Sequence, residues 1–119
     1  MDKLEFSKKL EKRTEDFADD ILSFCKLVPK NELTREIISQ LIRSSSSVGA
    51  NYIEANEALS KKDFFHRIRI CRKESKESRY WLGRLNKLYT DMRVKIDNLI
   101  KESTEFILPF SSIVSKSNS

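Results

Sequence analysis

The sequence predicts an all-α protein, an antiparallel up-down-up-down four-helix bundle formed by a single domain over residues 1–119. The first observation is a scarcity of turn formers: two glycines and two prolines leave few places for the tight turns that hairpins need. The second is periodicity, because apolar residues recur three or four positions apart in four long segments. Together they predict helices at roughly residues 2–28, 32–59, 61–89 and 92–114.

The first two predicted helices each carry one apolar stripe. In the first, the stripe begins near Phe6 and the helix ends before Pro29, which cannot continue it. In the second, the stripe runs from Ile38 to Leu59, straight through the four serines at residues 44–47. Because the spacing is uninterrupted, we interpret these serines as helical, with small side chains that let a neighbouring helix approach closely. A flexible linker is the alternative.

In the third predicted helix the apolar stripe runs from Phe64 to Tyr89, with a small centre around Ser75 that matches the serine-rich centre of the second. Helices with small facing residues pack closely, so we expect the second and third to form an antiparallel hairpin turned at residues 60–63. In the fourth, Pro109 removes a backbone donor and should kink or split the helix.

Composition and cysteine usage exclude several classes of protein. No apolar run is long enough to span a membrane, and the charged start lacks a signal-peptide core, so we expect a cytoplasmic protein. Cys25 and Cys71 are too few for a disulfide framework or a four-ligand zinc site. Both lie at or beside apolar positions, which predicts small buried hydrophobic side chains.

Catalytic signals are weak, and we expect no enzyme, no cofactor and no metal. The one histidine, His66, lies about 140° from Cys71 around the same helix, so the two cannot form a nucleophile pair. Asp63 and His66 have the carboxylate-x-x-His spacing of helix-bundle metal sites, but such sites need a second copy of the motif and two further glutamates. Neither glycine has a neighbour at the spacing of a phosphate-binding loop.

Positive charge is concentrated in one segment. Residues 61–95 hold twelve Lys or Arg residues and four acids, a net charge of +8 in a chain whose total is +5. Charge confined in this way indicates a surface that meets an anionic partner. The alternative is that these charges only keep one face of a helix exposed to solvent and bind no partner.

At 100° per residue, the third helix separates into a core stripe and two further faces. The first face, called here the basic ridge, combines seven cations with two aromatic residues: Lys62, Phe65, Arg69, Arg72, Lys73, Lys76, Arg79, Tyr80 and Lys87. The second, called here the apolar flank, consists of Ile70, Trp81 and Leu88. A second apolar stripe needs a second partner, either the fourth helix or another subunit. We predict an oligomer interface there, with Trp81 as its anchor.

Parts of the chain resemble a known family. They are Glu32-Leu33-Thr34, Ile42-Arg43-Ser44-Ser45, residues 47–55, Asp63-Phe64 and residues 74–85. This pattern is similar to that of the bacterial four-helix-bundle family whose founding members are encoded in intervening sequences of 23S ribosomal RNA genes. The accessory variability determinant of diversity-generating retroelements is related to it.

The resemblance implies a ring-shaped homopentamer with a basic surface. In the retroelement relative it implies binding to nucleic acid and to a reverse transcriptase. Where the commoner family pattern is Asn-Ile-Ala-Glu-Gly, this chain has Asn51-Tyr52-Ile53-Glu54-Ala55. Because the glycine of the family pattern is absent here, the pattern does not define where the second helix ends.

The leading functional hypothesis is a non-enzymatic, oligomeric accessory protein that binds nucleic acid through the basic ridge. Lys and Arg contact phosphates with release of counterions, and Phe65 and Tyr80 could stack on unpaired bases, which favours RNA or single strands. The alternative is a homo-oligomeric scaffold for an acidic protein partner. In that case the ridge could also meet acids of the first helix, Glu15, Asp16, Asp19 and Asp20, in the same or an adjacent subunit.

Overall fold

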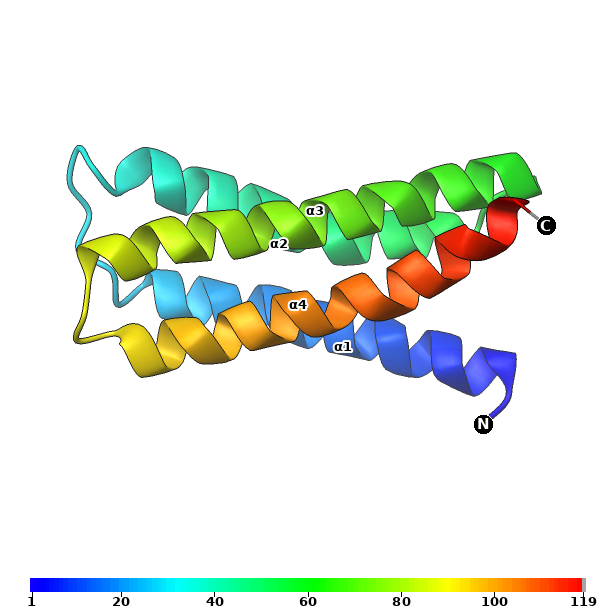
Figure 1. Ribbon diagram of the computed structural model, residues 1–119, viewed down its shortest axis with the longest axis horizontal. Helices are drawn as coiled ribbons and strands as arrows, with labels where there is room; N and C mark the ends of the chain where they lie inside the picture. Colours follow the sequence, from blue (N-terminus) through cyan, green and yellow to red (C-terminus); the bar gives the residue numbers. More distant parts are fainter. Residues whose placement is uncertain (119) are drawn as a thin grey trace.

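The computed structural model describes residues 1–118 as a four-helix bundle, which confirms the predicted fold class. The elements are α1 (Lys3–Cys25), α2 (Arg35–Asn56), α3 (Lys61–Leu88), α4 (Arg93–Ser115) and a short 3-10 helix, η1 (Lys116–Asn118). The helices alternate in direction, with α3 packed between α2 and α4, and α1 packed against α2 and α4 (Figure 1). The α2–α3 turn lies at the same end of the bundle as η1 and the start of α1 (Figure 1).

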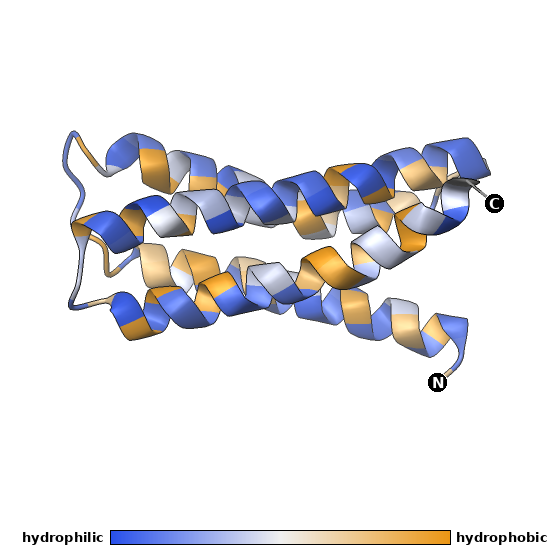
Figure 2. Cartoon of the chain, viewed as in Figure 1, coloured by the Kyte–Doolittle hydropathy of each residue, from blue (hydrophilic) through white to orange (hydrophobic). Residues whose placement is uncertain are grey.

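The hydrophobic core is built from one stripe on each helix. Apolar and polar residues alternate along every helix, as a one-sided stripe requires (Figure 2). The largest fully buried side chains are Phe17 of α1 and Phe106 and Phe110 of α4. The rings of Phe17 and Phe106 meet edge to face, with centroids 5.4 Å apart. Burial of each such ring stabilises the fold by roughly 1.5–3 kcal/mol.

The serines of α2 and α3 form a second, polar kind of packing, called here the serine seam. Ser44, Ser45, Ser75 and Ser78 are all buried between the helices. Ser78 Oγ donates to Ser44 Oγ at 3.0 Å, and the Cys71 thiol donates to the Val48 carbonyl at 3.4 Å. The four serines of α2 are therefore helical, and the predicted close approach of two small-residue helices is confirmed.

Two predicted boundaries between α1 and α2 are wrong by three residues. The first helix ends at Cys25 and not near residue 28, and the second begins at Arg35 and not near residue 32. Asn31 explains the late start, because its side chain accepts from the amides of Leu33 at 2.9 Å and Thr34 at 3.1 Å. Such local bonds offer the backbone an alternative to helix.

The α2–α3 turn is also displaced from its predicted position. Helix α2 ends at Asn56, so Leu59, which the stripe placed in the core, is fully exposed. The turn occupies residues 57–60, because Ser60 caps α3 by accepting the Asp63 amide at 3.1 Å. Helix α3 therefore begins at Lys61, as predicted.

Pro109 bends α4 but does not split it. The helix is continuous from Arg93 to Ser115 with Pro109 inside it. Its C-terminal half turns towards the start of α3 (Figure 1), as expected where proline removes a backbone donor. The bend brings η1 within reach of α3, where Arg69 Nη2 donates to Ser117 Oγ at 2.9 Å.

The two glycines occupy different environments. A Cβ atom at Gly49 of α2 would lie 3.1 Å from Oγ1 and 3.4 Å from Cβ of Thr14 in α1. A Cβ atom at Gly83 of α3 would meet nothing within 4 Å. Gly49 therefore permits the close approach of α1 and α2, whereas Gly83 has no such role.

Gly83→Ala should raise the free energy of unfolding by about 0.5–1 kcal/mol, because glycine costs that much in a helix interior. Gly49→Ala gains the same propensity but must displace Thr14, so it should be less stable than Gly83→Ala by about 1 kcal/mol. Urea denaturation of both variants measures the difference. Equal stability would contradict the close contact, and a Thr14→Ala background should remove most of the difference.

Candidate nucleic-acid interface

Helix α3 presents the basic ridge on its outer face. Lys62, Arg69, Lys73, Lys76, Lys87 and Tyr80 are exposed, and Phe65, Arg72 and Arg79 are half-buried. Among the cations of the ridge, Arg72 and Arg79 are nearest to the core stripe, about 100° and 80° from Cys71 around the helix, which accounts for their lower exposure. From Lys62 to Lys87 the ridge extends about 38 Å at 1.5 Å per residue.

Most exposed cations of the ridge have no acidic partner within residues 1–118. Lys73 Nζ lies 3.7 Å from Oε1 of Glu74, and Arg69 donates a hydrogen bond to the neutral Ser117 hydroxyl. Within the described part of the chain, Lys76 and Lys87 make no ion pair. The ridge thus keeps most of its charge available to an external anion.

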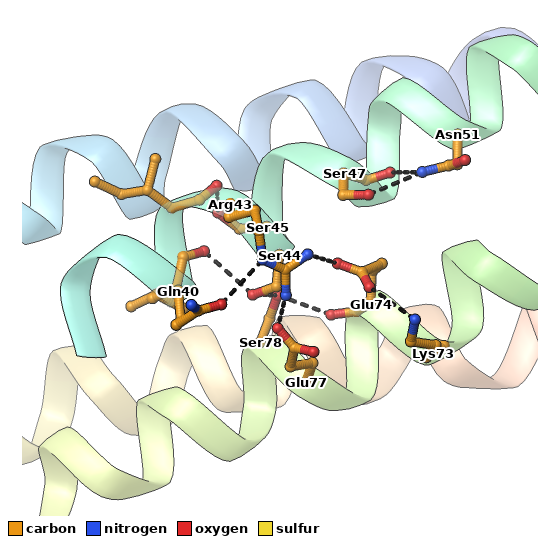
Figure 3. A network of polar contacts seen from close by, with 12 residues as sticks. Gln40, Arg43, Ser44, Ser45, Ser47, Asn51, Lys73, Glu74, Glu77 and Ser78 are labelled. Atoms are coloured by element: carbon orange, nitrogen blue, oxygen red, sulfur yellow. Dashed lines mark hydrogen bonds and ion pairs between the residues drawn. The ribbon is translucent and has the colours of Figure 1, made fainter. Parts of the chain in front are cut away.

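A network of polar contacts sets the orientation of α3 against α2 (Figure 3). Arg43 of α2 donates from Nη1 to Oε2 of Glu74 at 2.8 Å and also pairs with Glu77 through Nη2. The Glu74 side chain is 4% exposed and that of Glu77 29%. Gln40 extends the network by accepting from Arg43 Nε at 3.0 Å.

This network gives the buried charge the partners that it needs. A carboxylate out of water is costly unless it is paired and hydrogen-bonded. Because Glu74 and Glu77 lie on the side of α3 that faces α2, the pairing with Arg43 fixes the rotation of the helix about its axis. The ridge residues, on other sides of the same helix, are held outward as a result.

The apolar flank is only partly covered by the chain itself. Trp81 is half-buried against the hydrophobic core, and its Nε1 lies 3.4 Å from Oε2 of Glu77, to which it donates. Ile70 is also half-buried, whereas Leu88 is 42% exposed. The predicted role of these residues in an oligomer interface stays a prediction.

The acids of α1 do not pair with the ridge within the described residues. Asp16 accepts from Lys12 of its own helix at 2.7 Å. Arg13 of α1 bonds to Glu102 and Glu105 of α4, and hydrogen bonding to Glu102 is the main cause that raises its pKa. Any pairing of acidic α1 residues with α3 would have to come from another subunit.

The potentially reactive side chains are dispersed. Cys25 and Cys71 are free and buried, as predicted, and burial raises the pKa of the first thiol to about 11 and of the second to about 12. Both therefore stay protonated and weakly nucleophilic at neutral pH. Asp63 and His66 are exposed at the start of α3. No group of three or more His, Cys, Asp or Glu residues within residues 1–118 is placed to hold a metal ion.

Two cations that the helical phasing left out lie at one end of the ridge. Lys61 is the first residue of α3, and Lys116 is the first residue of η1. Together with Lys62 and Arg69 they line a hollow of about 950 Å³ at the end of the bundle. Lys116 joins this group through the bend of α4 at Pro109, and periodicity alone does not place η1 beside the start of α3.

Comparison with known proteins adds a family to this geometry. Residues 8–108 match the family model of the 23S rRNA-intervening sequence protein. The chain belongs to this family. The match spans most of the bundle, from the second turn of α1 to Leu108 in α4.

A solved structure supports the fold of this family member. It is the crystal structure of a protein of unknown function from the S23 ribosomal protein family of Bacteroides thetaiotaomicron. The two share 29% sequence identity with a TM-score of 0.79, over 92% of this chain and 97% of the other. No curated protein matches the chain. Along residues 1–118, no helix combines the length and apolar character needed to cross a bilayer.

Glu74→Ala should lower the free energy of unfolding by about 2–3 kcal/mol, because it removes a buried carboxylate together with its hydrogen bonds. Glu77→Ala is the matched control, since it faces the same Arg43 from a more exposed position and should cost about 0.5–1 kcal/mol. Thermal and urea unfolding measure both values. A larger loss for Glu77→Ala would show that the Glu74 pair does not hold α3 in place.

Proposed function

We propose that this protein is a non-enzymatic accessory protein that binds nucleic acid, preferably RNA or single strands, through the basic ridge of α3. The observation that carries the proposal is the row of exposed cations along about 38 Å of one helix face, most of them without an acidic partner among the described residues. Phosphates repeat along a strand, and a row of cations with matching direction can contact several at once.

The aromatic residues of the ridge support a preference for unpaired bases. Tyr80 is 58% exposed, and its ring packs edge to face on Trp81 at 5.0 Å, which holds it in place. Phe65 is half-buried beside Phe64. Aromatic side chains stack on the bases of single strands without reading their sequence.

Assembly into a ring is part of the same proposal. The exposed Leu88 and the half-buried Ile70 and Trp81 lie on the side of α3 away from the ridge, so a neighbouring subunit could cover them and leave the cations free. Five copies of the ridge in one particle would raise affinity through effective concentration. The relation to the retroelement accessory protein, with a reverse transcriptase as partner, belongs to this proposal as well.

Lys73→Gln, Lys76→Gln and Lys87→Gln combined should weaken binding to a single-stranded oligonucleotide and flatten its salt dependence. Each lost phosphate contact should reduce the slope of log Kobs against log salt by about 0.7, so three should reduce it by about 2. Filter-binding titrations from 50 to 200 mM salt, roughly the range over which such contacts weaken, measure the slope.

The matched control is Lys3→Gln, Lys8→Gln and Lys9→Gln on α1, which removes the same charge from exposed positions of a different helix. It should leave the slope nearly unchanged. If both triple variants bind alike, net charge and not the ridge is responsible. If the unmodified protein shows no retention at low salt, nucleic acid is not the partner, and an acidic protein becomes the alternative.

The mass of the particle tests the ring. We expect a species of five chains of 14.0 kDa by light scattering at micromolar concentration. Trp81→Ala together with Leu88→Asp should lower the mass while circular dichroism remains helical, because polar substitutions at a buried contact cost free energy of association. A monomeric unmodified protein would rule out both the ring and its gain in affinity.

A further inference from the structure

A hollow lies at the end of the bundle where the α2–α3 turn, the start of α3 and η1 meet. Its volume is about 950 Å³. The bent end of α4 leads to the start of α3 (Figure 1), and Lys116 and Ser117 of η1 are among the residues that line the hollow. The Arg69–Ser117 hydrogen bond of 2.9 Å ties the two walls together.

The described lining of the hollow is rich in cations. Lys61, Lys62 and Arg69 of α3 line it together with Lys116 of η1, and none of the lining residues that the structure describes is an acid, although the chain contains 18 Asp and Glu residues. Cations converging on a concave surface focus the field and attract anions more strongly than the same charges on a flat face. The charge of the hollow is therefore suited to a phosphate or another compact anion.

Aromatic rings lie beside these cations. Phe64 and Phe65 both line the hollow, and their rings meet edge to face with centroids 5.3 Å apart. Phe64 also packs against the core, which supports Phe65 from behind. A rigid aromatic surface next to a group of cations offers a base and its phosphate separate contacts within one site.

We propose that this hollow binds one unpaired nucleotide of a single-stranded nucleic acid, with the phosphate at Lys61 and Lys62 and the base against Phe65. This proposal rests on the proposed function. It adds that one nucleotide of the bound strand enters the hollow. The volume lies within the roughly 300–1,000 Å³ of typical small-molecule sites. A base pair in a duplex cannot present its face to Phe65, so the hollow selects single strands, whereas the ridge contacts phosphates of either form.

The test compares two pairs of substitutions on α3. Lys61→Gln with Lys62→Gln removes two exposed cations from the hollow, and Lys76→Gln with Lys87→Gln removes two from the ridge outside it. Both pairs of substitutions remove the same charge and leave the aromatic residues unchanged. For each double variant we would measure the affinity for a ten-nucleotide single strand and for a duplex of the same length. Circular dichroism and particle mass check the fold and the assembly of each variant.

We expect the ratio of single-strand to duplex affinity to fall roughly fivefold or more in the hollow pair and to stay within about twofold in the ridge pair. Phe65→Leu should lower the same ratio by roughly fivefold or more without any change of charge, since base stacking on an aromatic side chain is lost. Because the two lysines do not touch the core, the hollow pair tests the idea even if Phe65→Leu unfolds.

A spectroscopic measurement locates the site directly. On addition of a 5′-phosphorylated thymidine dinucleotide, the amide signals of residues 60–65 and of Ser117 should shift in a two-dimensional nitrogen–proton spectrum. Shifts confined to other residues would overturn the hollow as the site.

The outcomes separate this inference from the proposed function. If both pairs change the two affinities in the same proportion, the hollow is not a nucleotide site and the ridge remains one. If the hollow pair alters particle mass and residues 60–65 show no shifts, a second copy of the chain covers the hollow and the inference fails. If the unmodified protein binds neither oligonucleotide at low salt, the proposed function and this inference fail together.

Discussion

The close contact between α2 and α3 is the constraint on which the rest of the molecule depends. Small side chains let the two helices approach until the hydroxyls of Ser44 and Ser78 are 3.0 Å apart. At this separation the side chain of Arg43 reaches across to Glu74. The Ser44–Ser78 hydrogen bond and the Arg43–Glu74 pair together fix the position and the rotation of α3 relative to α2. In another register these buried polar groups would lose their partners, which costs free energy.

That rotation decides what the protein can present to a partner. Turning α3 by one residue, 100°, would carry cations of the ridge into the bundle and the flank of Trp81 into water. Burying unpaired cations costs several kcal/mol each, so the arrangement is strongly selected. The ridge is thus a surface whose direction is set by packing on the other sides of the helix.

Periodicity predicted much of this structure because the determining signals are local. The three-and-four spacing located all four helices and identified residues 44–47 as helical, and the phase of 100° per residue gave the outward face of α3. The end of α1 and both ends of α2 were missed. The start of α2 depends on a local side-chain bond, because Asn31 delays it. The burial of Glu74 depends on Arg43, 31 residues away. The hollow was missed for the same reason, since Lys116 reaches it only through the bend of α4.

The serine seam also bears on how the bundle folds. Serine and cysteine side chains offer little apolar surface, so the centre of the α2–α3 contact contributes less hydrophobic free energy than the aliphatic residues on either side of it. The large rings come from elsewhere, from Phe17 of α1 and from Phe106 and Phe110 of α4. An isolated α2–α3 hairpin would lack these rings, although its contact is the most extensive between any two helices of the described chain. The chain should acquire its ridge-bearing face late and all at once, when the first and last helices close over the hairpin.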